Sequence, residues 1–299
     1  MGICDGRVVI VTGGGRGLGR EYALAYAAEG AKVVVNDLGG AVAGGGHDRN
    51  AADSVVDEIH RAGGEAIANH DDVADWDGAG RLIDSAVSAF GRLDSVVNNA
   101  GILKVLPFGE HTLELWDATI RVHLRGHYCV IRRAYDYWKA QRAAGNPIDA
   151  RVVNISSNAG LQGAIGEAPY STAKGGIASL TLSLAAELAG DGITMNAVAP
   201  TGRTRMTVAY WPEAVAKANS GFDYMDPANV APMVVWLGSN LSGHITGQIF
   251  EVGGGSIALA DGWDLGPVID RQRKWEPAEI SDGVALLMMR RRATRPPWE

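Results

Sequence analysis

The chain has 299 residues, of which 46% are hydrophobic and 20% charged, proportions that exclude a disordered protein. Its net charge of −7 argues against a nucleic-acid partner, because nucleic-acid binders usually carry a basic surface. The two cysteines, Cys4 and Cys129, are too few for a disulfide framework. No signal peptide or membrane-length apolar stretch is visible, so we expect a cytoplasmic protein with no membrane partner.

Short runs rich in β-branched residues alternate with longer helix-forming stretches from residue 7 to residue 252. Several runs are apolar throughout, as expected for parallel strands covered on both faces. The sequence therefore predicts one α/β domain, a doubly wound parallel sheet of about seven strands with helices on both faces. The predicted strands are 7–11, 31–36, 65–70, 95–98, 151–156, 194–198 and 248–252, and the predicted helices are 18–29, 51–62, 75–90, 113–143, 170–189 and 227–237.

The last 44 residues differ from the rest of the chain. Residues 256–299 contain four prolines and no further sheet pattern, which predicts a C-terminal extension of the domain formed by residues 1–255. The extension could be an interface arm, a cover for a neighbouring active site, or a loose tail. The basic run at residues 290–295 fits a solvated tail as well as a partner site.

A glycine-rich turn, Thr12-Gly-Gly-Gly-Arg-Gly-Leu-Gly19, follows the first predicted strand and opens a helix. Glycines in such a turn accept positive φ and let main-chain N–H groups approach a pyrophosphate at the helix N-terminus. A strand, such a turn and a helix in this order are the setting of the dinucleotide fingerprint. We therefore expect residues of the turn to bind the cofactor, namely Gly13, Arg16, Gly17, Leu18 and Gly19.

An acidic residue, Asp37, follows the second predicted strand together with Leu38, eighteen residues beyond Gly19. This spacing is close to the roughly 20 residues expected for the acid that binds the adenosine ribose. A carboxylate there accepts hydrogen bonds from both ribose hydroxyls and repels a 2′-phosphate, which favours NAD over NADP. Arg16 argues the other way, since a guanidinium in this turn can pair with a phosphate.

Two tyrosine–lysine pairs have i, i+4 spacing, Tyr170 with Lys174 and Tyr135 with Lys139. On a helix this spacing places both groups on one face, where the ammonium favours the phenolate and equips the tyrosine for proton exchange. Ser157, thirteen residues before Tyr170, follows an apolar strand whose carboxyl end borders the crevice of the sheet. The position thirteen residues before Tyr135 is apolar, so that pair is predicted to lie on a helix surface.

These features together resemble the short-chain dehydrogenase/reductase family over roughly residues 5–255. The resemblance rests on the glycine turn, on Asn98-Asn-Ala-Gly101, on Ser157 and on the Tyr170 pair. It implies a Rossmann fold in which Tyr170 is the general acid/base, Lys174 lowers the pKa of Tyr170 and binds the nicotinamide ribose, and Ser157 orients the substrate. It also implies cofactor contacts from Asp72, Val73, Asn99, Ala100, Gly101, Tyr170, Lys174 and Thr204.

One departure from the family pattern is His123, which stands where many members carry an asparagine that holds a proton-relay water. An imidazole also donates and accepts hydrogen bonds, so His123 is a candidate catalytic residue whose ring would titrate near neutrality. A buried structural histidine explains the residue equally well, and the sequence leaves both interpretations open.

Three short segments narrow the resemblance to one branch of the family. Residues 36–40, 122–126 and 250–254 resemble the (3R)-hydroxyacyl-CoA dehydrogenase part of peroxisomal multifunctional enzymes and their bacterial homologues. The resemblance implies an NAD-dependent oxidoreductase that interconverts a secondary alcohol and a ketone on a small-molecule substrate of the 3-hydroxyacyl-CoA type. It also implies a homodimer or homotetramer formed through the two long helices.

Two alternatives to that function remain open. A hydroxysteroid or another bulky secondary alcohol is the first, because the aromatic and apolar residues near the expected substrate cover suit an acyl chain, a ring system or a plain core; they are Trp211, Phe222, Tyr224 and Met225. A non-catalytic, NAD-binding scaffold is the second. The seven histidines and two cysteines show no metal-ligand spacing, so no metal is expected.

Overall fold

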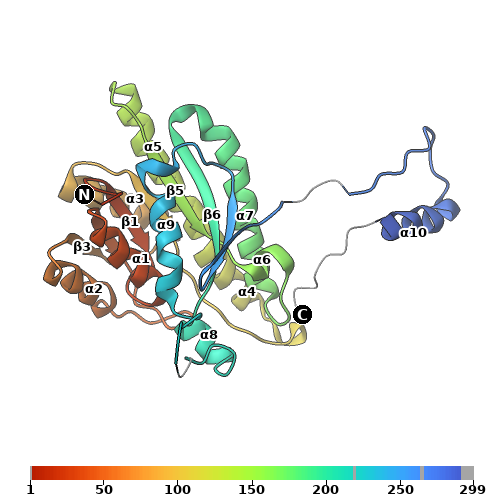
Figure 1. Cartoon of the computed structure of the whole chain (residues 1–299), viewed down its shortest axis with the longest axis horizontal. Coiled ribbons are helices and arrows are strands. Elements are labelled where there is room, and N and C mark those ends of the chain that lie inside the picture. The colour runs from red at the N-terminus through yellow and green to blue at the C-terminus, as the bar shows by residue number, and fades with distance from the viewer. Residues whose placement is uncertain (1, 218–219, 263–265, 291–299) are drawn as a thin grey trace.

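The computed structural model describes residues 2–217, 220–262 and 266–290, which form an eight-stranded sheet between two helical layers (Figure 1). The strand order is β3-β2-β1-β4-β5-β6-β7-β8, with β8 antiparallel to β7 and the other pairs parallel. The strands are β1 (Val8–Thr12), β2 (Lys32–Asn36), β3 (Glu65–Asn69), β4 (Ser95–Asn98), β5 (Ala150–Ile155), β6 (Ile193–Thr201), β7 (Ile249–Gly253) and β8 (Ser256–Leu259). The helices are α1 (Gly17–Ala28), α2 (Asn50–Arg61), α3 (Trp76–Phe90), α4 (Leu113–Ile120), α5 (Gly126–Ala143), α6 (Asn158–Gln162), α7 (Ala168–Leu188), α8 (Arg205–Tyr210), α9 (Ala231–Leu237) and α10 (Ile280–Arg290).

Alternate residues of the parallel strands face the two helical layers, as the pleat requires. In β1, Val9 and Val11 belong to the core that includes α1, α2 and α9, whereas Val8 and Ile10 belong to the core that includes α3, α5 and α7. All five residues of β1 are buried. Both faces are therefore covered, which is why these strands are apolar throughout and why the predicted doubly wound fold is confirmed.

The strand order reverses between β1 and β4, and this reversal opens a crevice at the carboxyl ends of the strands. Thr12, the last residue of β1, connects the turn after β1 with the turn after β4 below the crevice. Its hydroxyl accepts hydrogen bonds from the backbone N–H groups of Asn99 (2.9 Å) and Ala100 (3.1 Å). The turns that follow β1 and β4 are thereby held together.

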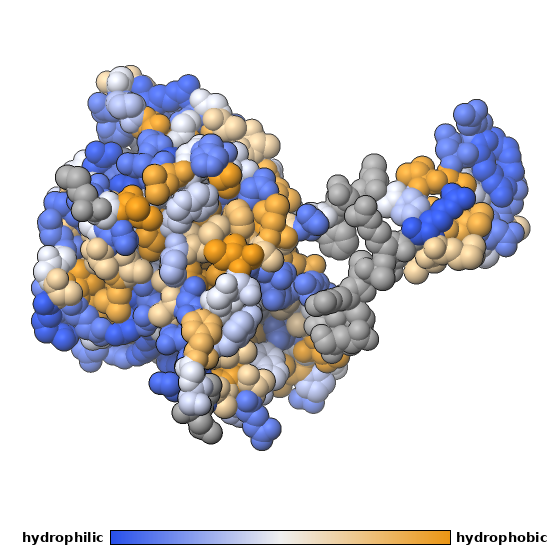
Figure 2. Space-filling view, in the orientation of Figure 1, coloured by the Kyte–Doolittle hydropathy of each residue, from blue (hydrophilic) through white to orange (hydrophobic). Residues whose placement is uncertain are grey.

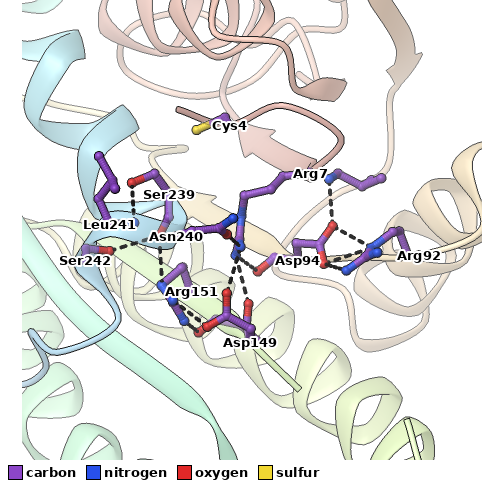
Figure 3. Close-up of polar contacts among 12 residues, drawn as sticks. Cys4, Arg7, Arg92, Asp94, Asp149, Arg151, Ser239, Asn240, Leu241 and Ser242 are labelled. Carbon is purple, nitrogen blue, oxygen red and sulfur yellow. Dashed lines mark hydrogen bonds and ion pairs between the residues drawn. The ribbon is translucent and has the colours of Figure 1, made fainter. Parts of the chain in front are cut away.

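The opposite edge of the sheet is held by a buried ionic network (Figure 3). Arg7, just before β1, and Arg151, in β5, are both buried and both donate to the carboxylate of Asp149, over 3.0 and 2.5 Å. Asp94, just before β4, accepts from the backbone N–H of Val8 (2.8 Å) and from the guanidinium of Arg92. The network therefore connects the amino ends of β1, β4 and β5, far from the crevice.

An eighth strand, β8, is the first difference from the sequence prediction, which placed no strand beyond residue 252. Residues 256–259 run antiparallel to β7 after a tight turn through Gly254 and Gly255. All four residues of β8 are exposed, so the strand lacks the apolar run that marks the others. Backbone pairing with β7, and not burial, makes this strand, and the predicted count of about seven was one too low.

The predicted helix 113–143 is divided, which is the second difference. A π-helical turn, η2 (Arg121–Arg125), separates α4 from α5 and contains the buried His123. Wider turns of this kind occur mostly within α-helices and often at functional sites. Hydrophobic spacing over three turns does not reveal one wider turn, so the sequence predicted a continuous helix.

The chain beyond β8 leaves the sheet, and helix α10 stands apart from the body of the molecule (Figures 1 and 2). Its segment is folded on itself: Trp275 packs against Gly283, and the guanidinium of Arg271 lies 4.4 Å from the centre of the Trp275 ring. Glu279 pairs with Arg271 and Arg273. Of the predicted basic run at 290–295, Arg290 is described and the remainder lies outside the described residues.

Candidate active site

A cleft of about 740 Å³ lies at the carboxyl ends of the strands, and every residue that the sequence predicted for the site lines it. These residues come from the turns after β1 to β6 and from helices far apart in sequence. The structure thus brings together Gly13, Arg16, Gly17, Leu18, Gly19, Asp37, Leu38, Asp72, Val73, Asn99, Ala100, Gly101, His123, Ser157, Tyr170, Lys174 and Thr204.

The turn at the floor of the cleft requires glycine at several positions, for its backbone conformation or for space. Gly13 and Gly17 have φ angles of +61° and +52°, and a Cβ on Gly19 would lie 2.1 Å from the carbonyl oxygen of Gly13. The amide of Asn99 donates to the carbonyls of Thr12 (2.9 Å) and Gly13 (3.1 Å) and so braces the turn. The result is a backbone cradle at the start of α1, which fits the pyrophosphate of a dinucleotide.

Asp37, just beyond the end of β2, is fixed by the backbone on both sides. One carboxylate oxygen accepts from the N–H of Gly15 (2.9 Å) and the other from the N–H of Gly39 (2.7 Å). Arg16, the residue that could favour NADP, forms an ion pair with Asp48 in the glycine-rich loop after β2. The negative charge is therefore fixed at the expected ribose position, and the Arg16 guanidinium is already paired.

Two further predicted contacts, Asp72 and Thr204, have structural partners of their own. Asp72 accepts from the N–H of Ala74 (2.8 Å) and pairs with Arg121 over 2.5 Å. Thr204 caps α8 through reciprocal hydrogen bonds with Thr207. Both residues line the cleft, so the partners fix side chains that a bound cofactor would meet.

Tyr170 and Lys174 lie one turn apart on α7, and both face the cleft. The Lys174 ammonium is buried, donates to the carbonyl oxygen of Ile155 over 2.5 Å, and lies 5.6 Å from the centre of the Tyr170 ring. Burial lowers the pKa of Lys174 to about 7. An amine with such a pKa can both hold and release a proton near neutral pH.

The hydroxyl of Tyr170 behaves differently from the sequence prediction. Burial raises the pKa of Tyr170 to about 12, although a hydrogen bond with Ser157 acts in the lowering direction. The sequence predicted that the Lys174 cation would lower this pKa. In this structure the Lys174 ammonium lies over the face of the Tyr170 ring and contacts the carbonyl oxygen of Ile155. Burial also disfavours the charged form of Lys174, so burial has the largest effect on the pKa of both residues.

His123 is buried beside Tyr170, with the two rings edge to face and their centres 5.1 Å apart. Its Nε2 lies 2.7 Å from the carbonyl oxygen and 3.0 Å from the backbone nitrogen of Ile102. Burial, together with the charge of Lys174, lowers the pKa of His123 to about 3. The expected titration near neutrality is therefore wrong, and a role for the neutral ring in a proton relay stays a prediction.

The space for the His123 ring depends on Gly101. A Cβ on Gly101 would lie 2.3 Å from Cε1 of the ring. The sequence predicted Gly101 only as a cofactor contact. Its lack of a side chain also lets the imidazole pack against the turn after β4.

The second tyrosine–lysine pair lies outside the cleft. Tyr135 is 3.4 Å from a carboxylate oxygen of Asp191, and with Lys139 it borders a smaller hollow near the start of β6. That hollow is at the amino ends of the strands, opposite the crevice. Residue spacing alone could not separate the two pairs, whereas the strand that precedes Tyr170 could.

Among the charged residues that line the cleft, Glu167 and Arg205 were not named from the sequence. Glu167 is buried, lines the cleft and is the N-cap residue of α7, three residues before Tyr170, and Arg205 begins α8. An acidic residue three positions before the predicted acid/base was a usable signal for Glu167. Arg205 offered no comparable signal, because it belongs to no spacing that the motifs define.

Residues 7–214 match the family described as short chain dehydrogenase. The chain belongs to this family. Its members use NAD(P) and act on CH–OH groups. In the described parts of the chain, no group of three or more His, Cys, Asp or Glu side chains could hold a metal ion, and no helix has the length and apolarity to cross a membrane.

Individual proteins and a solved structure are also similar to this chain. The chain is 43% identical over 281 residues to mouse peroxisomal multifunctional enzyme type 2, spanning 93% of this chain and 36% of that protein. It is 39% identical over 288 residues to the Mycobacterium tuberculosis hydroxyacyl-CoA dehydrogenase ChsB1, spanning 93% of this chain and 87% of the other. A crystal structure of a short chain dehydrogenase from Mycobacterium avium is 49% identical and matches 99% of both chains with a TM-score of 0.88.

Proposed function

We propose that this protein is an NAD-dependent dehydrogenase that interconverts a secondary alcohol and a ketone of the 3-hydroxyacyl-CoA type. The observation that carries the proposal is the meeting of Ser157, Tyr170 and Lys174 in one cleft with the glycine turn of α1. The names of the mouse and mycobacterial relatives support the acyl-CoA substrate class.

Tyr170, Ser157 and Lys174 each have a separate role in the proposed reaction. When bound, NAD supplies the hydride acceptor at its nicotinamide ring. During oxidation Tyr170 takes the proton of the substrate hydroxyl, and the Ser157 hydroxyl, which lines the same cleft, orients the substrate oxygen. Lys174 then holds or releases a proton at Nζ, and its charge stabilises the phenolate.

The choice of NAD over NADP follows from the charges at the end of β2. The Asp37 carboxylate is held by two backbone N–H groups and cannot easily turn away from a 2′-phosphate. We expect Asp37→Asn to improve kcat/KM with NADP relative to NAD by about tenfold, because it removes a like charge from the phosphate site. Arg16→Ala is the companion variant: a larger loss with NADP than with NAD would mean that Arg16, and not Asp37, decides the preference.

Part of the lining of the cleft is apolar, as an acyl chain requires. Trp211 and Met225, two of the four predicted substrate-cover residues, line it together with Leu103, Met206 and Val215. Phe222 and Tyr224 are exposed, and Tyr224 packs near Gly254. This arrangement supports an elongated apolar substrate; a hydroxysteroid is the alternative that a direct assay must separate.

The decisive experiment measures NADH formation with 3-hydroxyacyl-CoA thioesters and hydroxysteroids side by side. Tyr170→Phe should retain NADH binding and lose at least a hundredfold in kcat, because the variant lacks the proton acceptor. Tyr135→Phe is the matched control, since the other tyrosine–lysine pair lies outside the cleft, and should keep full turnover. NADH binding without turnover of any substrate by the unaltered enzyme would favour the scaffold.

We also propose a homodimer or homotetramer, with residues 1–255 as the dinucleotide-binding catalytic domain and 256–299 as its extension. Exposed apolar side chains on α5 and α7, Tyr128 and Leu182, support contact between copies. The arm with α10 stands away from the body (Figure 2). Val284 and Met289 on α10 are exposed. Light scattering should show at least a dimer, and a variant that ends at residue 262 reports whether the arm takes part.

The cytoplasm is the location that we propose. Cys4 and Cys129 are buried free thiols, which a reducing compartment preserves. Cell fractionation tests the proposal, and recovery in a membrane-enclosed organelle, as the names of the peroxisomal relatives suggest for those proteins, would contradict it.

A further inference from the structure

Glu167 is a buried acidic residue of the cleft to which the mechanism assigns no role. It precedes α7 as the N-cap residue, and only 6% of its surface is exposed. Its backbone carbonyl accepts a hydrogen bond from the N–H of Ser171 over 2.7 Å. In the described parts of the chain its carboxyl group has no hydrogen bond and no ion pair, although carboxylates are rarely buried without a partner.

Because Glu167 lies three residues before Tyr170, the charge of its carboxyl group acts on the ionisation of the Tyr170 phenol. Glu167 is the N-cap residue of α7 and Tyr170 is the third residue of that helix, and both residues line the cleft. Burial raises the pKa of Glu167, yet a carboxyl still ionises well before a phenol does. Its negative charge, after burial itself, is the group that acts to raise the pKa of Tyr170.

The other groups around the phenol do not cancel this charge. From η2, His123 contributes a neutral ring, and from the turn after β5, Ser157 contributes an uncharged hydroxyl. On α7 itself, the Lys174 ammonium opposes Glu167, but burial lowers the pKa of Lys174 to about 7, so its charge is lost well below the pH at which a phenol ionises. Next to Glu167, the Nε2 atom of His111 is engaged by the carbonyls of Leu106 (2.9 Å) and Gly166 (3.3 Å).

Resting on the function proposed above, we propose that Glu167 is a positioning residue that holds Tyr170 in its protonated form and so sets the pH at which alcohol oxidation begins. Two anions on one wall oppose each other, and a charged Glu167 therefore disfavours the phenolate. Oxidation needs the phenolate as proton acceptor, whereas ketone reduction needs the phenol as proton donor. The carboxyl thus widens the pH range of reduction and narrows that of oxidation.

The test replaces the charge and keeps the shape. Glu167→Gln should move the acidic limb of the kcat/KM profile for oxidation, and the basic limb for reduction, toward lower pH by about one unit. Glu167→Asp, which keeps the charge, should restore the original profile. Glu187→Gln removes an exposed carboxylate from the same helix and is the matched control, so its profiles should not move.

A second readout does not depend on turnover. The near-ultraviolet absorbance of tyrosinate is followed against pH, and the same titration of Tyr170→Phe is subtracted to isolate Tyr170. Tyr22 and Tyr26 do not interfere, because burial raises the pKa of each far beyond the titrated range. The Tyr170 titration should begin about one pH unit lower in Glu167→Gln.

The outcomes separate this inference from the function on which it rests. Unchanged kinetic profiles and an unchanged Tyr170 titration in folded Glu167→Gln would overturn the role of Glu167 and leave the dehydrogenase intact. An equal shift in Glu187→Gln would show a general charge effect and overturn it as well. Inactivity of the unaltered enzyme on every alcohol would count against the function, while the absorbance titration would still decide the role of Glu167.

Discussion

The ionic network at the amino edge of the sheet predicts a large loss of stability from one substitution, Asp149→Ala. The Asp149 carboxylate is shared by Arg7 and Arg151, whose side chains are 6% and 2% exposed (Figure 3). Removing it leaves two buried guanidinium groups without their shared counter-charge. Breaking a buried ion pair from one side usually costs about 3–5 kcal/mol.

Two features of the network place the expected loss at the lower end, about 3 kcal/mol. Asp149 itself is 58% exposed, so water screens part of its charge. Arg151 also keeps its bonds to the carbonyls of Ser239 (3.1 Å) and Ala150 (3.0 Å). For a chain of this length a loss of that size lowers the melting temperature by about 5 °C.

Lowering the pH should reduce the difference in unfolding free energy between the unaltered protein and Asp149→Ala. Burial acts to raise the pKa of Asp149, but hydrogen bonds and charges from Arg151 and Arg7 outweigh it and hold the pKa below its usual value. The carboxylate therefore stabilises the fold above about pH 4, and this contribution disappears as the pH falls through the lowered pKa.

Urea unfolding and thermal melts at pH 7 measure the effect, with Asp77→Ala as the control. Asp77 is 79% exposed and pairs with Arg133 over 3.1 Å, so its removal should cost less than about 1 kcal/mol. Equal losses in the two variants, or a loss in Asp149→Ala that does not shrink in acid, would refute the argument from buried, shared charge.

Three further predictions concern the cleft. Gly19→Ala should weaken NADH binding at least tenfold in a fluorescence titration, because its Cβ would lie 2.1 Å from the Gly13 carbonyl, whereas Gly109→Ala meets no atom within 4 Å and should bind normally. Gly101→Ala should lower kcat more than NADH affinity, since it displaces the imidazole beside Tyr170; an unchanged kcat would contradict this. Lys174→Met should raise the melting temperature more at pH 7 than at pH 10. Burial lowers the pKa of Lys174 in the folded protein to about 7, whereas the pKa in the unfolded chain is about 10.4. The buried amine therefore destabilises the fold at pH 7, and this destabilisation becomes smaller as the pH rises toward about 10.4. A gain that is equal at both values would contradict that account.

Much of the fold was predictable because local patterns and covering layers agree. The β1 run Val8–Val11 is apolar throughout, and such a run requires cover on both faces whatever the rest of the chain does. β8 was missed because its residues are exposed and it exists through pairing with β7. The turn around His123 was missed because one wider turn leaves hydrophobic spacing almost unchanged.

Residue types and their spacing were enough to name the cradle of glycines, the acid after β2 and the tyrosine–lysine pair that follows a strand, since each depends on chemistry within a short segment. The ionisation of those groups was not available at that level. The pKa of about 12 for Tyr170, of about 7 for Lys174 and of about 3 for His123 all reflect burial, and burial arises only when segments distant along the chain pack around each group. For the same reason Glu167 became visible as an unpaired carboxyl only once α7 was placed against the wall of the cleft.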